Sequence, residues 1–237
     1  MIDSLELILR KRQIFDHGPM YNEFIHDAVI HEPWNAYSSI FFFIPVIFWL
    51  IYLRGKYRRY GIITALLPLL FLNGLGSTLF HAFRASNWFL LLDWLPAALM
   101  TLILSIYFWN LITHKVWKSI AVVLGFYVLA FIMVKLLSQF TGISGPSVGY
   151  FFTGAAFLVP VIIDLKRHQW KHAGLYVVSL CFLVFALLFR ILDYPTPNPF
   201  PWLPQGTHFL WHVTSSLAVF TLGFYIYKTT NETRNMN

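Results

Sequence analysis

The stretch GIITALLPLLFLNGLGSTLFHAF occupies residues 61–83, and it contains no Asp, Glu, Lys or Arg from one end to the other. A helix needs about 20 predominantly apolar residues to cross the hydrocarbon core of a membrane. The stretch is too long for a membrane strand, and it lacks the alternation of apolar and polar residues that such a strand has. Residues 61–83 are therefore predicted to form a membrane-spanning helix.

Six further stretches have the same character, and short charged or Pro- and Gly-rich breaks separate them. The whole chain is 58% hydrophobic and only 11% charged, whereas an ordinary soluble domain is about 25% charged. We therefore expect an all-α fold, a single polytopic domain of seven transmembrane helices over residues 1–237, with a short polar N-terminal segment at 1–34. The predicted spans are 35–53, 61–83, 88–109, 117–138, 147–165, 172–192 and 207–228.

The basic residues predict the orientation of this bundle. Seven crossings place the two termini on opposite sides, and the breaks at 54–60, 114–118 and 166–171 hold most of the 17 Lys and Arg residues. The positive-inside rule then predicts a cytoplasmic C-terminus and a non-cytoplasmic N-terminus. The formal charge of +7 is distributed over short loops, which favours anionic lipid headgroups as its partners and argues against nucleic acid.

Polar side chains occur at one end of four of the predicted spans. Ser77 and His81 lie in the last turns of the second span, Asp93 lies in the first turns of the third, and His208 and His212 open the seventh. With seven crossings, all of them fall on the N-terminal side of the membrane. Ionisable groups at this depth are costly and usually face the bundle interior. The first span begins with further polar residues, namely Glu32, Asn35, Ser38 and Ser39.

The spacing of these residues suggests a metal site. Residues four apart share a helix face, as do Ser77 with His81 and His208 with His212. Two histidines on one helix and a third on another can form a three-histidine site, which zinc favours and in which a fourth position stays open for water. The alternative is that each histidine is an ordinary polar residue near the membrane surface.

A catalytic site of this kind also needs a base. The residues between the two histidines of the last span, Phe209-Leu210-Trp211, include no Glu. Asp93 is the carboxylate that lies within a span at the matching depth. As an alternative, Asp93 pairs with Arg84 or Arg190 near the same face of the membrane.

Four short motifs occur in a fixed order between about residue 30 and residue 220. They are Glu32-Pro33-Trp34-Asn35 with Ser38 and Ser39, then Gly74 to His81 (GLGSTLFH), Leu91 to Pro96 (LLDWLP) and His208 to His212 (HFLWH). Their order and spacing resemble the alkaline ceramidase family. The wider superfamily includes adiponectin-receptor-type and GPI-remodelling proteins, which share the Ser, Asp and three-His set.

The resemblance implies a seven-helix zinc hydrolase of sphingolipid metabolism that cleaves the amide of ceramide, or of a related N-acyl lipid, into a fatty acid and an amine such as a sphingoid base. It implies that His81, His208 and His212 bind zinc. Ser77 and Asp93 would be the polar partners beside the zinc. From their chemistry we expect both to be catalytic, Ser77 as a donor to the oxyanion and Asp93 as a general base. A lipid receptor and an ester hydrolase of lipid remodelling stay open as alternatives, and so do a monomer and a homodimer.

The chain departs from the family pattern at two places. Trp94 follows Asp93, where family members often have an acidic residue. Animal members carry a calcium site near the N-terminus, and here only its later Glu is matched cleanly. Oxygen-bearing side chains upstream still offer ligands for a hard cation, and the alternative is a solvated polar segment. The candidate calcium ligands are Asp16, Asn22, Glu23 and Glu32.

Overall fold

The computed structural model describes residues 16–140, 145–193 and 198–235. Within these ranges all regular secondary structure is helical, and six helices are long and apolar enough to cross a membrane. The protein is therefore a helical, multi-pass membrane protein, as the sequence predicts.

The helices coincide closely with the predicted spans. The first crossing is continuous over Pro33–Tyr52 and consists of α2 (Pro33–Ser39), the 3-10 turn η1 (Ile40–Phe42) and α3 (Phe43–Tyr52). The fifth predicted span corresponds to a helix that is not among the six apolar ones, so its crossing stays a prediction. The remaining helices are α4 (Gly61–Phe83), α5 (Asn87–Thr113), α6 (Val116–Phe140), α7 (Gly145–Arg167), α8 (Ala173–Leu192) and α9 (His208–Asn235).

By its internal contacts the chain divides into two compact units. The first unit comprises the chain up to Ala97 together with the chain from Gly174 onward, and the second comprises Ala98–Ala173. In the second unit α6 packs against α7, and the indole N–H of Trp109 in α5 donates a hydrogen bond of 3.0 Å to the carbonyl of Ala156 in α7. None of the predicted site residues lies in this second unit.

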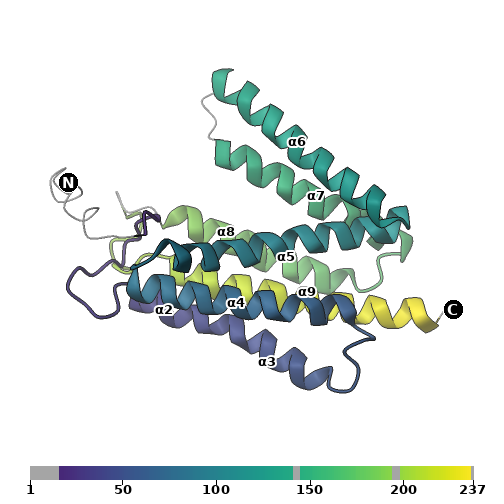
Figure 1. Ribbon diagram of the computed structural model, residues 1–237, viewed down its shortest axis with the longest axis horizontal. Coiled ribbons are helices and arrows are strands. Elements are labelled where there is room, and N and C mark those ends of the chain that lie inside the picture. The colour runs from purple at the N-terminus through teal and green to yellow at the C-terminus, as the bar shows by residue number, and fades with distance from the viewer. Residues whose placement is uncertain (1–15, 141–144, 194–197, 236–237) are drawn as a thin grey trace. The chain divides into compact units, whose positions relative to one another are not determined.

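In the first unit α2 packs against both α4 and α9, and the three helices lie side by side (Figure 1). Pro33 occupies the first position of α2, where the fixed φ angle of proline matches that of a helix. The Glu23 carboxylate accepts the backbone N–H groups of Trp34 and Asn35, which have no partner within the helix. Further along, α3 packs its aromatic side chains on α9, with Phe48 against Phe220 at a ring distance of 4.9 Å.

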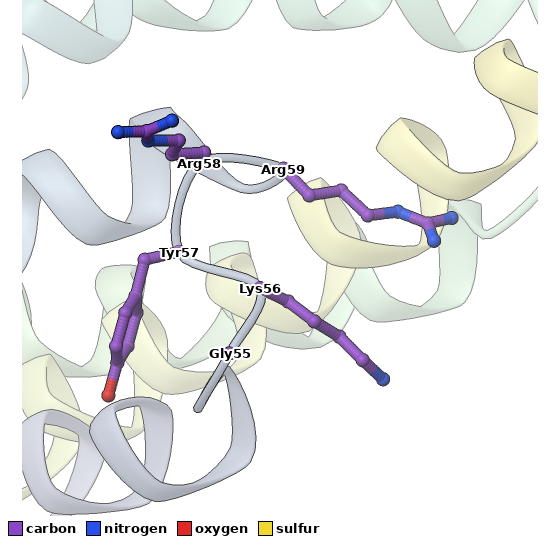
Figure 2. A pocket seen from close by; sticks show the side chains of 5 residues that line it. All are labelled: Gly55, Lys56, Tyr57, Arg58 and Arg59. Atoms are coloured by element: carbon purple, nitrogen blue, oxygen red, sulfur yellow. The ribbon is translucent and has the colours of Figure 1, made fainter.

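The first unit has two chemically different ends. At one end, the loop of residues 54–60 joins α3 to α4, and the side chains of Lys56, Arg58 and Arg59 diverge from it (Figure 2). Arg59 donates a hydrogen bond of 2.7 Å to the Asn231 side chain near the C-terminal end of α9. Because α4 runs away from this loop and α9 runs toward it, the end of α4 and the start of α9 meet at the opposite end (Figure 1).

Candidate metal centre

Three histidines from two helices meet at this opposite end. His81 lies in the last turn of α4, and His208 and His212 lie one turn apart at the start of α9. All three are buried, and one ring nitrogen from each lies within 4.8 Å of the others. The ring centroids are 5.1, 4.9 and 4.7 Å apart. The three side chains, which the sequence placed on two spans at one depth, could thus hold a metal ion.

The proton of the His81 ring is fixed by its partner. Its Nδ1 lies 2.5 Å from Oε2 of Glu32, and both side chains are fully buried. A carboxylate only accepts hydrogen bonds, so Nδ1 must carry the proton. The lone pair is then on Nε2, which is buried and has no hydrogen-bond partner among the described residues. A histidine that binds metal through one nitrogen commonly donates from the other in this way.

The His212 ring is oriented by the start of the first crossing. Its Nδ1 lies 2.9 Å from the Ser38 hydroxyl, which itself donates to the carbonyl of Asn35 at 3.0 Å. A serine hydroxyl has a single proton, so Nδ1 of His212 donates to the oxygen of Ser38. The lone pair of His212 is therefore on Nε2, as it is in His81.

The His208 ring is covered by a residue of the N-terminal segment. The ring of Tyr21 packs on it with centroids 4.0 Å apart, and also lies 5.1 Å from the ring of His81. The buried Nδ1 of His208 has no hydrogen-bond partner in the described part of the chain. Two of the three rings thus carry buried nitrogens without a hydrogen-bond partner, which suits them to bind a metal ion.

Asp193 fixes the point at which α9 begins. One of its oxygens accepts the backbone N–H of Thr207 at 2.7 Å and the side-chain amide of Asn22 at 3.2 Å. Burial raises the pKa of Asp193, and the hydrogen bond from Thr207 opposes this shift. Only glycine fits at position 206, because its φ is +71° and a Cβ there would lie 1.9 Å from the Asp193 oxygen.

Ser77 and Asp93 face the histidines from adjacent helices. The Ser77 hydroxyl lies 2.9 Å from the Ser39 hydroxyl and 3.4 Å from Nε2 of His212. The Asp93 carboxylate interacts with the side chains of Ser77 and His81. The two helices approach closely at Gly76, where a Cβ would lie 2.3 Å from the backbone of α5.

The alternative pairings of Asp93 with arginine are not found. Arg84 is bound instead to Asp16 and Glu32. Arg190 lies over the ring of Trp211, with 5.1 Å between its guanidinium carbon and the ring centroid. Among the described residues no ion pair joins Asp93 to either arginine, although Arg190 attracts the Asp93 carboxylate electrostatically.

The four candidate calcium ligands have protein partners. Asp16 and Glu32 bind Arg84, Glu23 accepts two backbone N–H groups of α2, and Asn22 donates to Asp193. Within the described ranges, the three histidines are the one group of His, Cys and acidic side chains close enough to hold a metal. The calcium site therefore gains no support from the structure and stays a prediction.

Sequence reasoning missed two residues of this site. Tyr21 lies in a segment without any periodic pattern, so nothing in the sequence marks it as a neighbour of His208. Arg84 follows His81 by three positions, and residues three apart on a helix are neighbours. That spacing was the signal that could have linked Arg84 to the histidine cluster.

Comparison with protein-family models found no matching family, and a search of curated proteins found no match. The fold and the site thus define the class of protein from geometry alone. It is a multi-pass helical membrane protein with a buried three-histidine group that could hold a metal ion.

Proposed function

We propose that the chain is a zinc-dependent hydrolase that cleaves the amide bond of ceramide or a related N-acyl lipid within the membrane. The products would be a fatty acid and an amine such as a sphingoid base. The observation that carries the proposal is the meeting of His81, His208 and His212 beside Ser77 and Asp93. The order of the motifs that resemble the alkaline ceramidase family supports the same reaction.

The donor set favours zinc over calcium and magnesium. Three imidazoles with a fourth position open to water are typical of catalytic zinc sites, whereas calcium and magnesium prefer oxygen ligands. When bound to these histidines, zinc supplies a Lewis acid that makes water reactive near neutral pH and polarises a carbonyl. Glu32 and Ser38 contribute by holding the rings of His81 and His212 with their lone pairs free.

Asp93 is the group we assign to proton transfer. Its carboxylate is hydrogen-bonded to Ser77 and interacts electrostatically with His81, so we assign to it the acceptance of a proton from the attacking water. The same proton is then donated to the amide nitrogen as the C–N bond breaks, which releases a neutral amine. A neutral leaving group is needed because an amide anion is too basic to depart.

Ser77 is the group we assign to the oxyanion. Its hydroxyl is hydrogen-bonded to Asp93 and lies 2.9 Å from that of Ser39. When Asp93 takes up the proton of the attacking water, the Ser77 proton would turn to the oxygen that becomes negative. One donor of this kind contributes about 3 kcal/mol of transition-state stabilisation. Ser77 is a poorer candidate for the nucleophile, because the neighbouring lone pair of His212 belongs to the metal site and cannot serve as its base.

We further propose that the N-terminus and the site lie on the non-cytoplasmic side and the C-terminus in the cytoplasm. The basic loop 54–60 supports this orientation, because it lies at the end of the first unit opposite to the histidines. A site at the ends of the spans suits a lipid whose amide lies near the headgroup region while its acyl chain extends between apolar helix faces.

The decisive experiment measures fatty-acid release by purified protein from a panel of ceramides, other N-acyl lipids and ester lipids. Release from N-acyl lipids by the wild type, and not by Asp93→Asn, supports the proposal. Release from esters alone would favour a lipid-remodelling ester hydrolase. Lipid binding without any release would favour a lipid receptor.

A further inference from the structure

Arg84 is the largest of the fully buried side chains in the described part of the chain, with 1% of its surface exposed. It ends α4 in the left-handed backbone conformation, with φ at +47° and its N–H bonded to the carbonyl of Phe80. Glycine is the usual residue in this conformation after a helix, and a long side chain there is strained. Five other described non-glycine residues also have a positive φ, so the feature that distinguishes Arg84 is the burial of its long charged side chain.

The guanidinium of Arg84 joins two acidic residues that lie 16 positions apart in the sequence. Its Nε and Nη2 bind the two oxygens of Asp16 at 2.7 and 3.0 Å, and its Nη1 binds Oε1 of Glu32. Nη2 also donates to the carbonyl of Pro19 at 3.0 Å. Bidentate hydrogen bonds of this kind fix the orientation of the carboxylate as well as its distance from the guanidinium. Arg84 therefore holds both ends of segment 16–32.

Segment 16–32 reaches the histidines at two points. At its end, Oε2 of Glu32 holds the ring of His81, and the backbone N–H of Glu32 bonds to the carbonyl of the same histidine at 3.1 Å. Near its start, Tyr21 covers the ring of His208.

We propose that Arg84 is a positioning residue of the metal centre: by binding Asp16 and Glu32 together, it holds Glu32 against His81 and closes segment 16–32 over the three histidines. This role rests on the metal centre of the proposed function, but not on the identity of the lipid. Without Arg84 the two buried carboxylates lack their counter-charge. Glu32 then no longer fixes the ring of His81, and loss of such a partner weakens metal binding about tenfold to a hundredfold.

The test compares the zinc affinity of folded, monodisperse variants by competition with a chromophoric chelator. Arg84→Gln and Asp16→Asn are expected to weaken zinc binding by about tenfold or more. Arg84→Lys is expected to restore affinity only in part, because an ammonium lacks the planar fork of the guanidinium. The control is Arg58→Gln in the exposed loop 54–60, which should bind zinc as the wild type does.

Hydrogen exchange of segment 16–32 provides a second measurement that does not depend on zinc. Faster exchange in Asp16→Asn than in Arg58→Gln is expected. Wild-type zinc affinity and wild-type exchange in folded Asp16→Asn and Arg84→Lys would overturn the positioning role, even if both variants melt at lower temperature. Absence of zinc from the wild type itself would overturn the proposed function, so the two failures are distinguishable.

Discussion

The carboxylate of Glu32 lies 2.5 Å from Nδ1 of His81, and both side chains are removed from solvent. A buried carboxylate at this distance decides which nitrogen of the ring carries the proton and directs the other nitrogen toward the histidine cluster. Glu32, which the sequence suggested as a calcium ligand, thus orients a candidate zinc ligand. This contact makes the first prediction possible.

Glu32→Gln is expected to weaken zinc binding about tenfold to a hundredfold, because a neutral amide holds the His81 ring less firmly than a carboxylate. The measurement is zinc affinity by chelator competition. Glu23→Gln is a matched control, since Glu23 is also buried in the same segment but binds the backbone of α2. Equal loss of affinity in both variants would mean that the effect is general destabilisation.

Removal of a metal ligand is expected to remove the metal. Wild-type protein should contain about one zinc per chain, and His81→Ala or His212→Ala should lose it because two imidazoles do not complete the site. Elemental analysis of the purified proteins measures this. His168→Ala is the control, because His168 lies outside the cluster and contacts Asp164. Full zinc content in both ligand variants would show that the site is assigned wrongly.

The two catalytic assignments are separable from metal binding. Asp93→Asn should abolish turnover while zinc stays bound, because the amide cannot accept a proton. Ser77→Ala should lower turnover by about 10²–10³, the usual cost of losing one oxyanion donor. Turnover and zinc content are measured on the same samples. Asp164→Asn, a change at another buried carboxylate outside the site, should keep normal turnover, and activity retained by Asp93→Asn would refute its role as base.

Glu23 is expected to make stability depend on pH. Burial raises its pKa from 4.5 to about 7, against the opposing effect of the N–H groups of Trp34 and Asn35. Because the folded state then binds the proton more tightly than the unfolded state, this contribution is present below pH 4.5 and is lost as pH rises through about 7. The melting temperature of the wild type, relative to Glu23→Gln, should therefore fall between pH 5 and pH 8. A constant difference across this window would contradict the shift.

The spans and the histidine cluster could be predicted from the sequence because both depend on local spacing. Residues 61–83 give the bounds of α4 without correction, since hydropathy over about 20 residues is enough to define a crossing. The cluster followed from depth and from the four-residue spacing of His208 and His212. Hydropathy and four-residue spacing are both properties of a single helix, so they can be recognised without knowing which helices pack beside it.

The partners of the buried charges could not be predicted in the same way. Asp16 and Arg84 are 68 positions apart, and segment 16–32 has no periodicity that assigns its side chains to a face. In the sequence, Asp16, Glu23 and Glu32 are simply three acidic residues. In the fold, Asp16 binds Arg84, Glu23 binds the start of α2, and Glu32 binds both Arg84 and His81. Their roles therefore became visible only in three dimensions.

The orientation in the membrane is testable by labelling single cysteines in intact cells with a thiol reagent that cannot cross the membrane. The background is Cys181→Ser, which removes the only native thiol. Arg58→Cys, in the basic loop 54–60, should be labelled only after the membrane is opened, because the positive-inside rule places that loop in the cytoplasm. Trp202 lies between α8 and α9 at the histidine end, and its side chain is 76% exposed. Trp202→Cys should therefore be labelled in intact cells. The reverse pattern would place the candidate metal centre on the cytoplasmic side.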